Sequence, residues 1–215
     1  MLAKLSMTVA LCLLVSACSS SEAPKKEAAK APAAVAMPPV AQTQAWLDDY
    51  EPRVKAAIAG SHFELERRDN LLVVTAPVLG TFNPDRPHMM LPVVLGPLTR
   101  MAKLLESDDK VAVLVLGHAD SSGVAAQNRE LSDQRARAVT SIFRLSGLQS
   151  NRLMVKGLGS DMPRAANDSA EGRALNRRVE IMLTAKDTMT ALVAKYSAPT
   201  PATTVAAAEK PASKP

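Results

Sequence analysis

The chain has 215 residues and a formal net charge of +5. Val, Leu and Ile concentrate between about residues 54 and 184, whereas Pro and Ala dominate both ends, so one central domain of ordinary size is expected. Three Phe, two Tyr and one Trp are too few for a base-stacking surface, and no Lys/Arg stripe follows a helix face, so nucleic acid is excluded as an expected partner.

The N-terminus is typical of an exported protein. Residues 1–17 read as a signal peptide, because Lys4 precedes the short apolar run Val9–Val15, which is too short to span a membrane. The sequence LVSACS that ends at Ser19 resembles the bacterial lipobox, in which the cysteine becomes the acylated first residue of the mature chain. The pattern therefore predicts lipidation of Cys18, and the alternative is an ordinary signal peptide cleaved near Ala17.

Both flanks of the central domain have the composition of unfolded chain. Residues 18–41 consist mainly of Ser, Ala, Pro and Lys, and they contain too few large apolar side chains to fold. We expect a disordered linker after the lipidated cysteine, with a reach on the order of 70 Å if it is extended. Residues 186–215 are expected to form a short helix followed by a disordered Ala/Pro tail.

The first expected elements are a helix and a hairpin. Apolar side chains at helical spacing predict a short amphipathic helix within residues 42–61, and Pro52 predicts that this helix either kinks or begins there. The alternating residues 63–67 and the β-prone residues 71–75 predict a hairpin, with its turn at Asp69-Asn70.

The later elements alternate between helix and strand. A loop at 77–88 leads into a helix over residues 93–105, with a break expected at Gly96-Pro97. Residues 111–116 are apolar on both faces, which predicts a covered strand, and the next helix over 124–146 is expected to bury Leu145. The remaining elements expected are a strand at 153–156, a helix at 171–176 and an alternating strand at 179–183. The fold class expected is therefore α/β, with helices packed on a mixed sheet.

Polar residues follow the covered strand in the stretch GHADSSG at 117–123. In layered α/β domains, ligands bind beyond the carboxyl ends of strands, where loops lead into helices. One stripe of the following helix carries these side chains at helical spacing: Asn128, Leu131, Ser132 and Arg135. Asp120 and Arg135 can converge near one end of that helix and bind a group with both an ammonium and a carboxylate. Spacing alone favours the alternative, in which the two side chains pair with each other.

Enzyme chemistry is not expected. His118, Asp120 and Ser121 lie too close in sequence to align as a catalytic triad, and no GxSxG motif is present. His118 and Asp120 are too few to hold a metal ion, and His62 and His88 fall in unrelated loops. The sequence therefore predicts no catalytic residue, no metal and no cofactor.

Three segments together carry a family resemblance: GHAD at 117–120, NRELSDQRA at 128–136 and GRALNRRVE at 172–180. They closely resemble the OmpA-like C-terminal domain, which is shared with peptidoglycan-associated lipoproteins. We place the boundaries of this domain at 62–185. The resemblance implies non-covalent binding of peptidoglycan through the meso-diaminopimelate of its stem peptide.

The resemblance also implies the residues of the site. Asp120 would take the ammonium of diaminopimelate, and Arg135 would take its carboxylate. The other ligand-binding positions implied are Asn128, Leu131, Ser132, Asn83 and Arg178.

Some positions depart from the family pattern or have a second reading. Ala119 stands where the family usually has threonine, and Asn83 stands where it often has an acidic residue. For the Arg177-Arg178 pair, an internal salt bridge with Glu180 or Asp161 is expected for at least one arginine.

Combined with the lipobox, the resemblance implies an outer-membrane lipoprotein whose domain faces the periplasm and tethers the membrane to the cell wall. Ser19 after Cys18 is typical of outer-membrane sorting in enteric-type bacteria. The alternative is a periplasmic regulatory or scaffold lipoprotein that acts mainly through a protein partner. Other envelope proteins stay open as partners, and the presence of both Asp120 and Arg135 favours wall binding.

Overall fold

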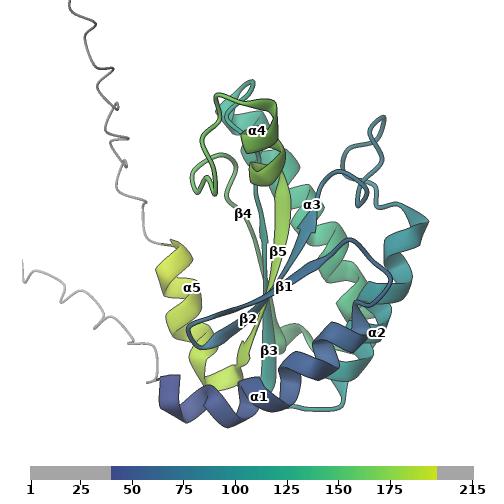
Figure 1. Ribbon diagram of the computed structural model, residues 1–215, viewed down its shortest axis with the longest axis vertical. Helices are drawn as coiled ribbons and strands as arrows, with labels where there is room; N and C mark the ends of the chain where they lie inside the picture. The colour runs from purple at the N-terminus through teal and green to yellow at the C-terminus, as the bar shows by residue number, and fades with distance from the viewer. Residues whose placement is uncertain (1–39, 198–215) are drawn as a thin grey trace, which may run out of the picture. The chain divides into compact units, whose positions relative to one another are not determined.

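The computed structural model describes residues 40–197 (Figure 1). The expected signal peptide, Cys18, almost all of the linker and the C-terminal tail from residue 198 lie outside the described residues. Between residues 40 and 197, no helix is both long enough and apolar enough to cross a membrane.

The elements follow the expected alternation of strands and helices. The strands are β1 (Glu64–Arg68), β2 (Leu71–Pro77), β3 (Val111–Gly117), β4 (Leu153–Gly157) and β5 (Arg178–Ala185). The helices are α1 (Val40–Ala57), α2 (Leu95–Glu106), α3 (Ala125–Leu145), α4 (Ala170–Asn176) and α5 (Met189–Ser197). Short 3-10 turns lie at Pro92–Val94, Ser150–Arg152 and Lys186–Thr188. The α/β class, the hairpin and the short helix after the last strand are confirmed.

The strands form one sheet in the order β1-β2-β5-β3-β4. β3 and β4 pair in parallel, and the other neighbours are antiparallel. Gly117, the last residue of β3, is in register with Val179 near the start of β5. The loop after β3 and the segment before β5 therefore lie at the same end of the sheet, which is the upper end in Figure 1.

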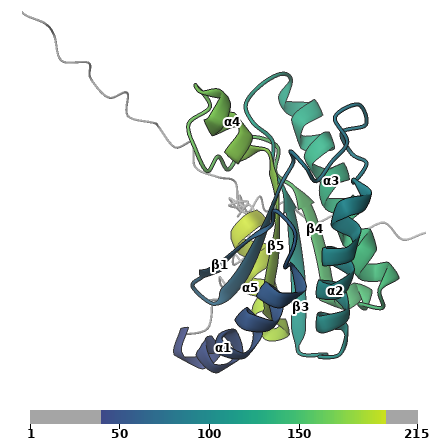
Figure 2. The ribbon, with the colours of Figure 1, turned by 45° about the vertical axis from the view of Figure 1, so that its right-hand side comes forward.

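Both faces of the sheet are covered, but by different helices (Figure 2). Val113 and Ile181 belong to the larger core, which α1, α2 and α3 complete. Leu114 and Met182 point to the other face, where they pack with Leu192 of α5. β3 is buried along its whole length, as its unbroken apolar sequence predicted.

Four details differ from the sequence expectations. The alternating sequence of β5 is typical of a strand with one exposed face, but β5 is buried on both faces because α5 covers the second. Leu145 was expected in the core, but it ends α3 and is 83% exposed. α1 begins at Val40 rather than after residue 41, and it includes Pro52, which rules out the alternative in which the helix starts at that proline. α2 continues through Gly96-Pro97, because Pro97 lies in its first turn, where the amide would have no helical acceptor.

Two glycines allow α3 to lie directly against the ends of β3 and β4. A Cβ at Gly117 would overlap the carbonyl oxygen of Ser132, and a Cβ at Gly157 would lie 2.5 Å from the amide nitrogen of Asp133. This close approach fixes the height of α3 above the sheet, and with it the position of the side chains that α3 carries toward the loop after β3.

Candidate functional site

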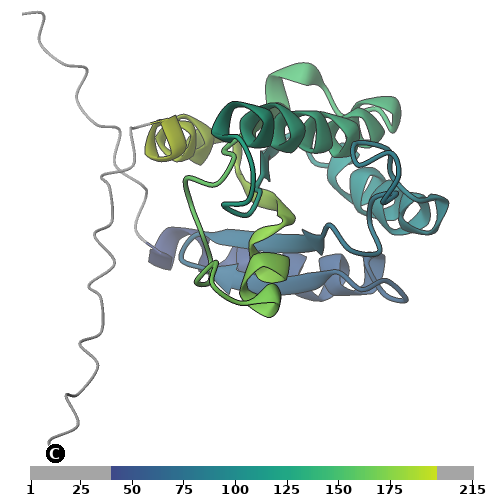
Figure 3. The same cartoon turned by 90° about the horizontal axis from the view of Figure 1, so that it is seen from above.

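Three segments meet at the end of the sheet onto which Figure 3 looks down: the loop after β2, the loop after β3, and α4 with the start of β5. The backbone joins them, because the amide of His118 donates to the carbonyl of Arg178 and the amide of Val78 donates to the carbonyl of Arg177, both at 2.9 Å. Main-chain hydrogen bonds, and not side-chain contacts alone, therefore hold the segments of the site together.

The carboxylate of Asp120 is held from two sides. Its Oδ1 accepts a hydrogen bond from the amide of Ser122 at 2.9 Å, and its Oδ2 lies 2.5 Å from a terminal nitrogen of Arg177. Asn128 donates to the carbonyls of both Asp120 and Ser122, which fixes the loop against the start of α3. Burial opposes ionisation, but the hydrogen bonds from Arg177 and Ser122 lower the pKa of Asp120 below its usual value, so the site contains a carboxylate.

Arg135 is 5% exposed and lies on α3. Its Nε donates to the carbonyl of Pro87 at 2.7 Å, and its guanidinium lies 5.6 Å from the ring centroid of Phe82. Burial and the nearby charge of Arg177 lower the pKa of Arg135 to about 10, so the side chain is still cationic at neutral pH. Asp120 and Arg135 make no ion pair with each other in the described structure; Asp120 is paired with Arg177 instead.

The other expected positions on α3 have mainly structural contacts. The hydroxyl of Ser132 is buried; it donates to the carbonyl of Arg129 and accepts from the amide of Gly159. Ser132 thus joins α3 to the loop after β4. Leu131 is half-buried on the same helix.

Asn83 shapes the loop after β2. Its side-chain oxygen accepts hydrogen bonds from the amides of Asp85 at 2.8 Å and Arg86 at 3.1 Å. This turn brings the carbonyl of Pro87 to Arg135, so Asn83 supports the position of the arginine through the loop.

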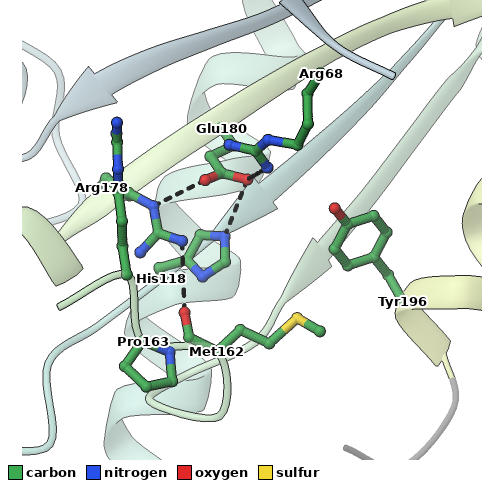
Figure 4. Close-up of a pocket in the computed structure, with 8 residues that line it drawn as sticks. Arg68, His118, Met162, Pro163, Arg178, Glu180 and Tyr196 are labelled. Atoms are coloured by element: carbon green, nitrogen blue, oxygen red, sulfur yellow. Dashed lines mark hydrogen bonds and ion pairs between the residues drawn. The ribbon is translucent and has the colours of Figure 1, made fainter. Parts of the chain in front are cut away.

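Arg178 lies apart from this group, on the face that α5 covers (Figure 4). Its Nε donates to Oε1 of Glu180 at 2.9 Å, and a terminal nitrogen donates to the carbonyl of Met162. The expected internal salt bridge with Glu180 is therefore confirmed for Arg178. Of the two adjacent arginines, it is Arg177 that contacts Asp120. Neighbouring side chains at the start of a strand point to opposite faces, and this alternation could have predicted that the two arginines have different partners.

Arg178 and Glu180 line a pocket of about 280 Å³ together with His118, Arg68 and Tyr196 (Figure 4). His118 is 2% exposed, its Nε2 lies 3.8 Å from Oε2 of Glu180, and neither ring nitrogen has a hydrogen-bond partner in the described structure. Burial and the adjacent charge of Arg178 outweigh the attraction of Glu180 and lower the pKa of His118 to about 4. The imidazole is therefore neutral at physiological pH.

The chemistry of the site is that of charge recognition. One carboxylate and two guanidiniums lie together at the end of the sheet. Among residues 40–197, no three side chains of His, Cys, Asp or Glu gather as a metal site requires.

Comparisons with known proteins agree with this fold. The model of the OmpA family matches residues 96–177. The chain is 34% identical over 138 residues to the probable lipoprotein YiaD of Escherichia coli strain K12, covering 64% of this chain and 63% of YiaD. It is also 34% identical over 131 residues to the outer-membrane lipoprotein YfiB of Pseudomonas aeruginosa, covering 61% of this chain and 76% of YfiB.

A solved structure has a similar fold. The cell wall anchor of the T6SS from Pseudomonas aeruginosa superimposes with a TM-score of 0.51 at 28% identity, over 70% of this chain and 99% of that chain. The fold, the match to the OmpA family and the 34% identity to YfiB over 76% of its length all indicate the same family. The chain therefore belongs to the OmpA family, and its α/β domain is an OmpA-like C-terminal domain.

Proposed function

We propose that this protein binds peptidoglycan non-covalently, with Asp120 and Arg135 holding the ammonium and the carboxylate of diaminopimelate. The observation that carries the proposal is the arrangement of these two charges. They lie at the same end of the sheet without pairing with each other, and the terminal nitrogens of Arg135 have no hydrogen-bond partner among the described residues. Family membership and the similarity to a cell wall anchor support the wall as the ligand.

Each charge-assisted hydrogen bond contributes about 1.5–3 kcal/mol. A site with a few such bonds is expected to bind in the micromolar to millimolar range. The wall presents many identical stem peptides, so several copies anchored beside it bind through effective concentration. Weak individual contacts therefore suffice for a stable but movable attachment.

The proposal includes an anchor at the other end of the chain. Acyl chains on Cys18 would hold the protein in the outer membrane, and residues 19–39 would bridge to the domain that faces the periplasm. The support is the lipobox-like sequence and the similarity to YfiB, which is named as an outer-membrane lipoprotein.

Sedimentation with purified sacculi tests the binding site. Replacement of either Asp120 or Arg135 by alanine is expected to weaken binding by about 2–5 kcal/mol, because each leaves the opposite ligand charge without a partner. Arg137→Ala is a matched control, since Arg137 lies on the same helix with its side chain 66% exposed and pairs with Asp133. Glu130→Ala, an exposed acidic position on α3, is the control for Asp120.

One result would remove the assignment. If the protein with both Asp120→Ala and Arg135→Ala pellets with sacculi as well as the wild type does, the wall contact lies elsewhere. That result would favour the alternative function, in which the domain acts through a protein partner.

A further inference from the structure

One carboxylate oxygen of Asp120 is already paired with a cation of the protein itself. Arg177 covers Oδ2 at 2.5 Å, while Oδ1 is held by the Ser122 amide. The side chain of Asp120 is 10% exposed and that of Arg177 is 39% exposed, so the guanidinium is the more accessible partner of the ion pair. An incoming ammonium group that binds Oδ2 of Asp120 competes with this guanidinium.

Arg177 has a fixed backbone, and its side chain is held through one ion pair. Its amide donates to the carbonyl of Arg173 at the end of α4, and its carbonyl accepts from the amide of Val78. Among the described residues, Asp120 is the single hydrogen-bond partner of its guanidinium. The neighbouring Arg178, in contrast, donates three hydrogen bonds and is 5% exposed.

The displaced guanidinium stays close to a second cation. The charge of Arg177 already lowers the pKa of Arg135, so the two like charges repel each other. Once Arg177 leaves Asp120, a ligand that carries only an ammonium leaves both guanidiniums without an anion. A ligand with an adjacent carboxylate supplies an anion to both guanidiniums at once.

We propose that Arg177 is an exchangeable internal cation that makes this site selective for ligands carrying an ammonium and a carboxylate on the same carbon. Without ligand, Arg177 occupies the position of the ammonium on Asp120. When the ligand binds, Arg177 passes to the ligand carboxylate beside Arg135. This inference rests on the proposed function and narrows the substrate class: stem peptides whose diaminopimelate carboxylate is free bind, and those with lysine or an amidated carboxylate bind poorly.

Calorimetric titration of the full-length protein in detergent tests the inference. The three probes are a diaminopimelate muropeptide, the same muropeptide with that carboxylate amidated, and the lysine muropeptide. We expect the wild type to prefer the first probe by roughly thirtyfold or more, which corresponds to about 2 kcal/mol. In Arg177→Gln the competing cation is absent, so affinity for the lysine probe should rise about tenfold and the preference should fall to within roughly threefold.

Arg177→Lys is the matched control, because it keeps the internal cation and should keep the preference. The melting temperature of each variant shows whether the domain is folded. A preference that is unchanged in Arg177→Gln overturns the exchange while leaving the proposed function intact. Loss of binding to all probes in a folded Arg177→Gln also overturns it, because Arg177 would then support Asp120 rather than compete at it. A wild type that binds none of the probes overturns the proposed function and this inference together.

Discussion

The buried imidazole of His118 should make the stability of the domain depend on pH in a range where few other groups titrate. His118 is 2% exposed, and its pKa is lowered to about 4 by burial and by Arg178. In the unfolded chain its pKa returns to about 6.5. Below about pH 6.5 the unfolded chain therefore binds a proton that the folded domain does not, so the free energy of unfolding decreases as the pH falls.

The magnitude follows from the difference between the two pKa values. Above about pH 7.5 both states are neutral and His118 adds no pH dependence. Between about pH 7.5 and 5, protonation of His118 in the unfolded chain lowers the free energy of unfolding by about 2 kcal/mol, and by about pH 4 it lowers it by about 3 kcal/mol. The lowered pKa values of Asp120 and Glu180 also reduce stability in acid, but their unfolded values lie near about 4. Above about pH 5, the pH dependence of stability therefore reports mainly on His118 and not on these two carboxylates.

Urea unfolding at a series of pH values between about 7.5 and 5 measures this effect. His118→Gln cannot titrate and should show a nearly flat free energy of unfolding over the same range, whatever its absolute stability. His88→Gln is the control, because His88 is exposed in the loop after β2 and should keep the wild-type slope. A wild-type protein that is equally stable at both ends of the range would refute the buried neutral imidazole.

Two further predictions concern the packing of α3 and the anchor. Gly117→Ala should destabilise the domain by about 1–3 kcal/mol in urea unfolding and weaken sacculus binding, because its Cβ would overlap the Ser132 carbonyl and push α3 outward. Gly96→Ala, whose Cβ would meet only the end of the Arg100 side chain at 3.5 Å, should change stability by less than about 0.5 kcal/mol, and an equal loss in both variants would contradict the packing argument. Cys18→Ser should move the protein from the membrane fraction to the soluble fraction after cell lysis, and a wild-type chain already found in the soluble fraction would contradict the anchor.

The sequence predicted the elements where a local pattern determines them. The unbroken apolar run in β3 predicted a covered strand because a strand with one wet face would alternate. The alternation of polar and apolar residues in β5 wrongly suggested an exposed face, because the residues that bury this face lie outside the strand. Glu180 is buried because Arg178 and Arg68 bring positive charge to it and α5 closes that face, and no pattern within residues 179–183 contains this information.

The sequence predicted where the site residues lie, but it did not predict which partners they contact. The motif resemblance placed Asp120 and Arg135 in one group, and the fold brings them to the same end of the sheet. The partner of each charge depends on tertiary structure: Arg135 donates to Pro87 across a loop whose path Asn83 sets, and Asp120 pairs with Arg177 rather than with Arg135. The spacing of residues along one helix does not show that Arg135 contacts Pro87 or that Asp120 contacts Arg177.

The segments that carry Asp120 and Arg177 are joined by main-chain hydrogen bonds as well as by the ion pair between the two side chains. The amide of His118 donates to the carbonyl of Arg178, and the amide of Ser121 donates to Asn167, so the loop that carries Asp120 is bonded to the segment that carries Arg177 whether or not the ion pair exists. We therefore expect that removing the ion pair leaves the backbone in place and that exchange of one cation for another at Asp120 involves side chains alone. Because adjacent side chains alternate at the start of β5, Arg178 is fixed on the buried face, while the side chain of Arg177 is 39% exposed and pairs with Asp120.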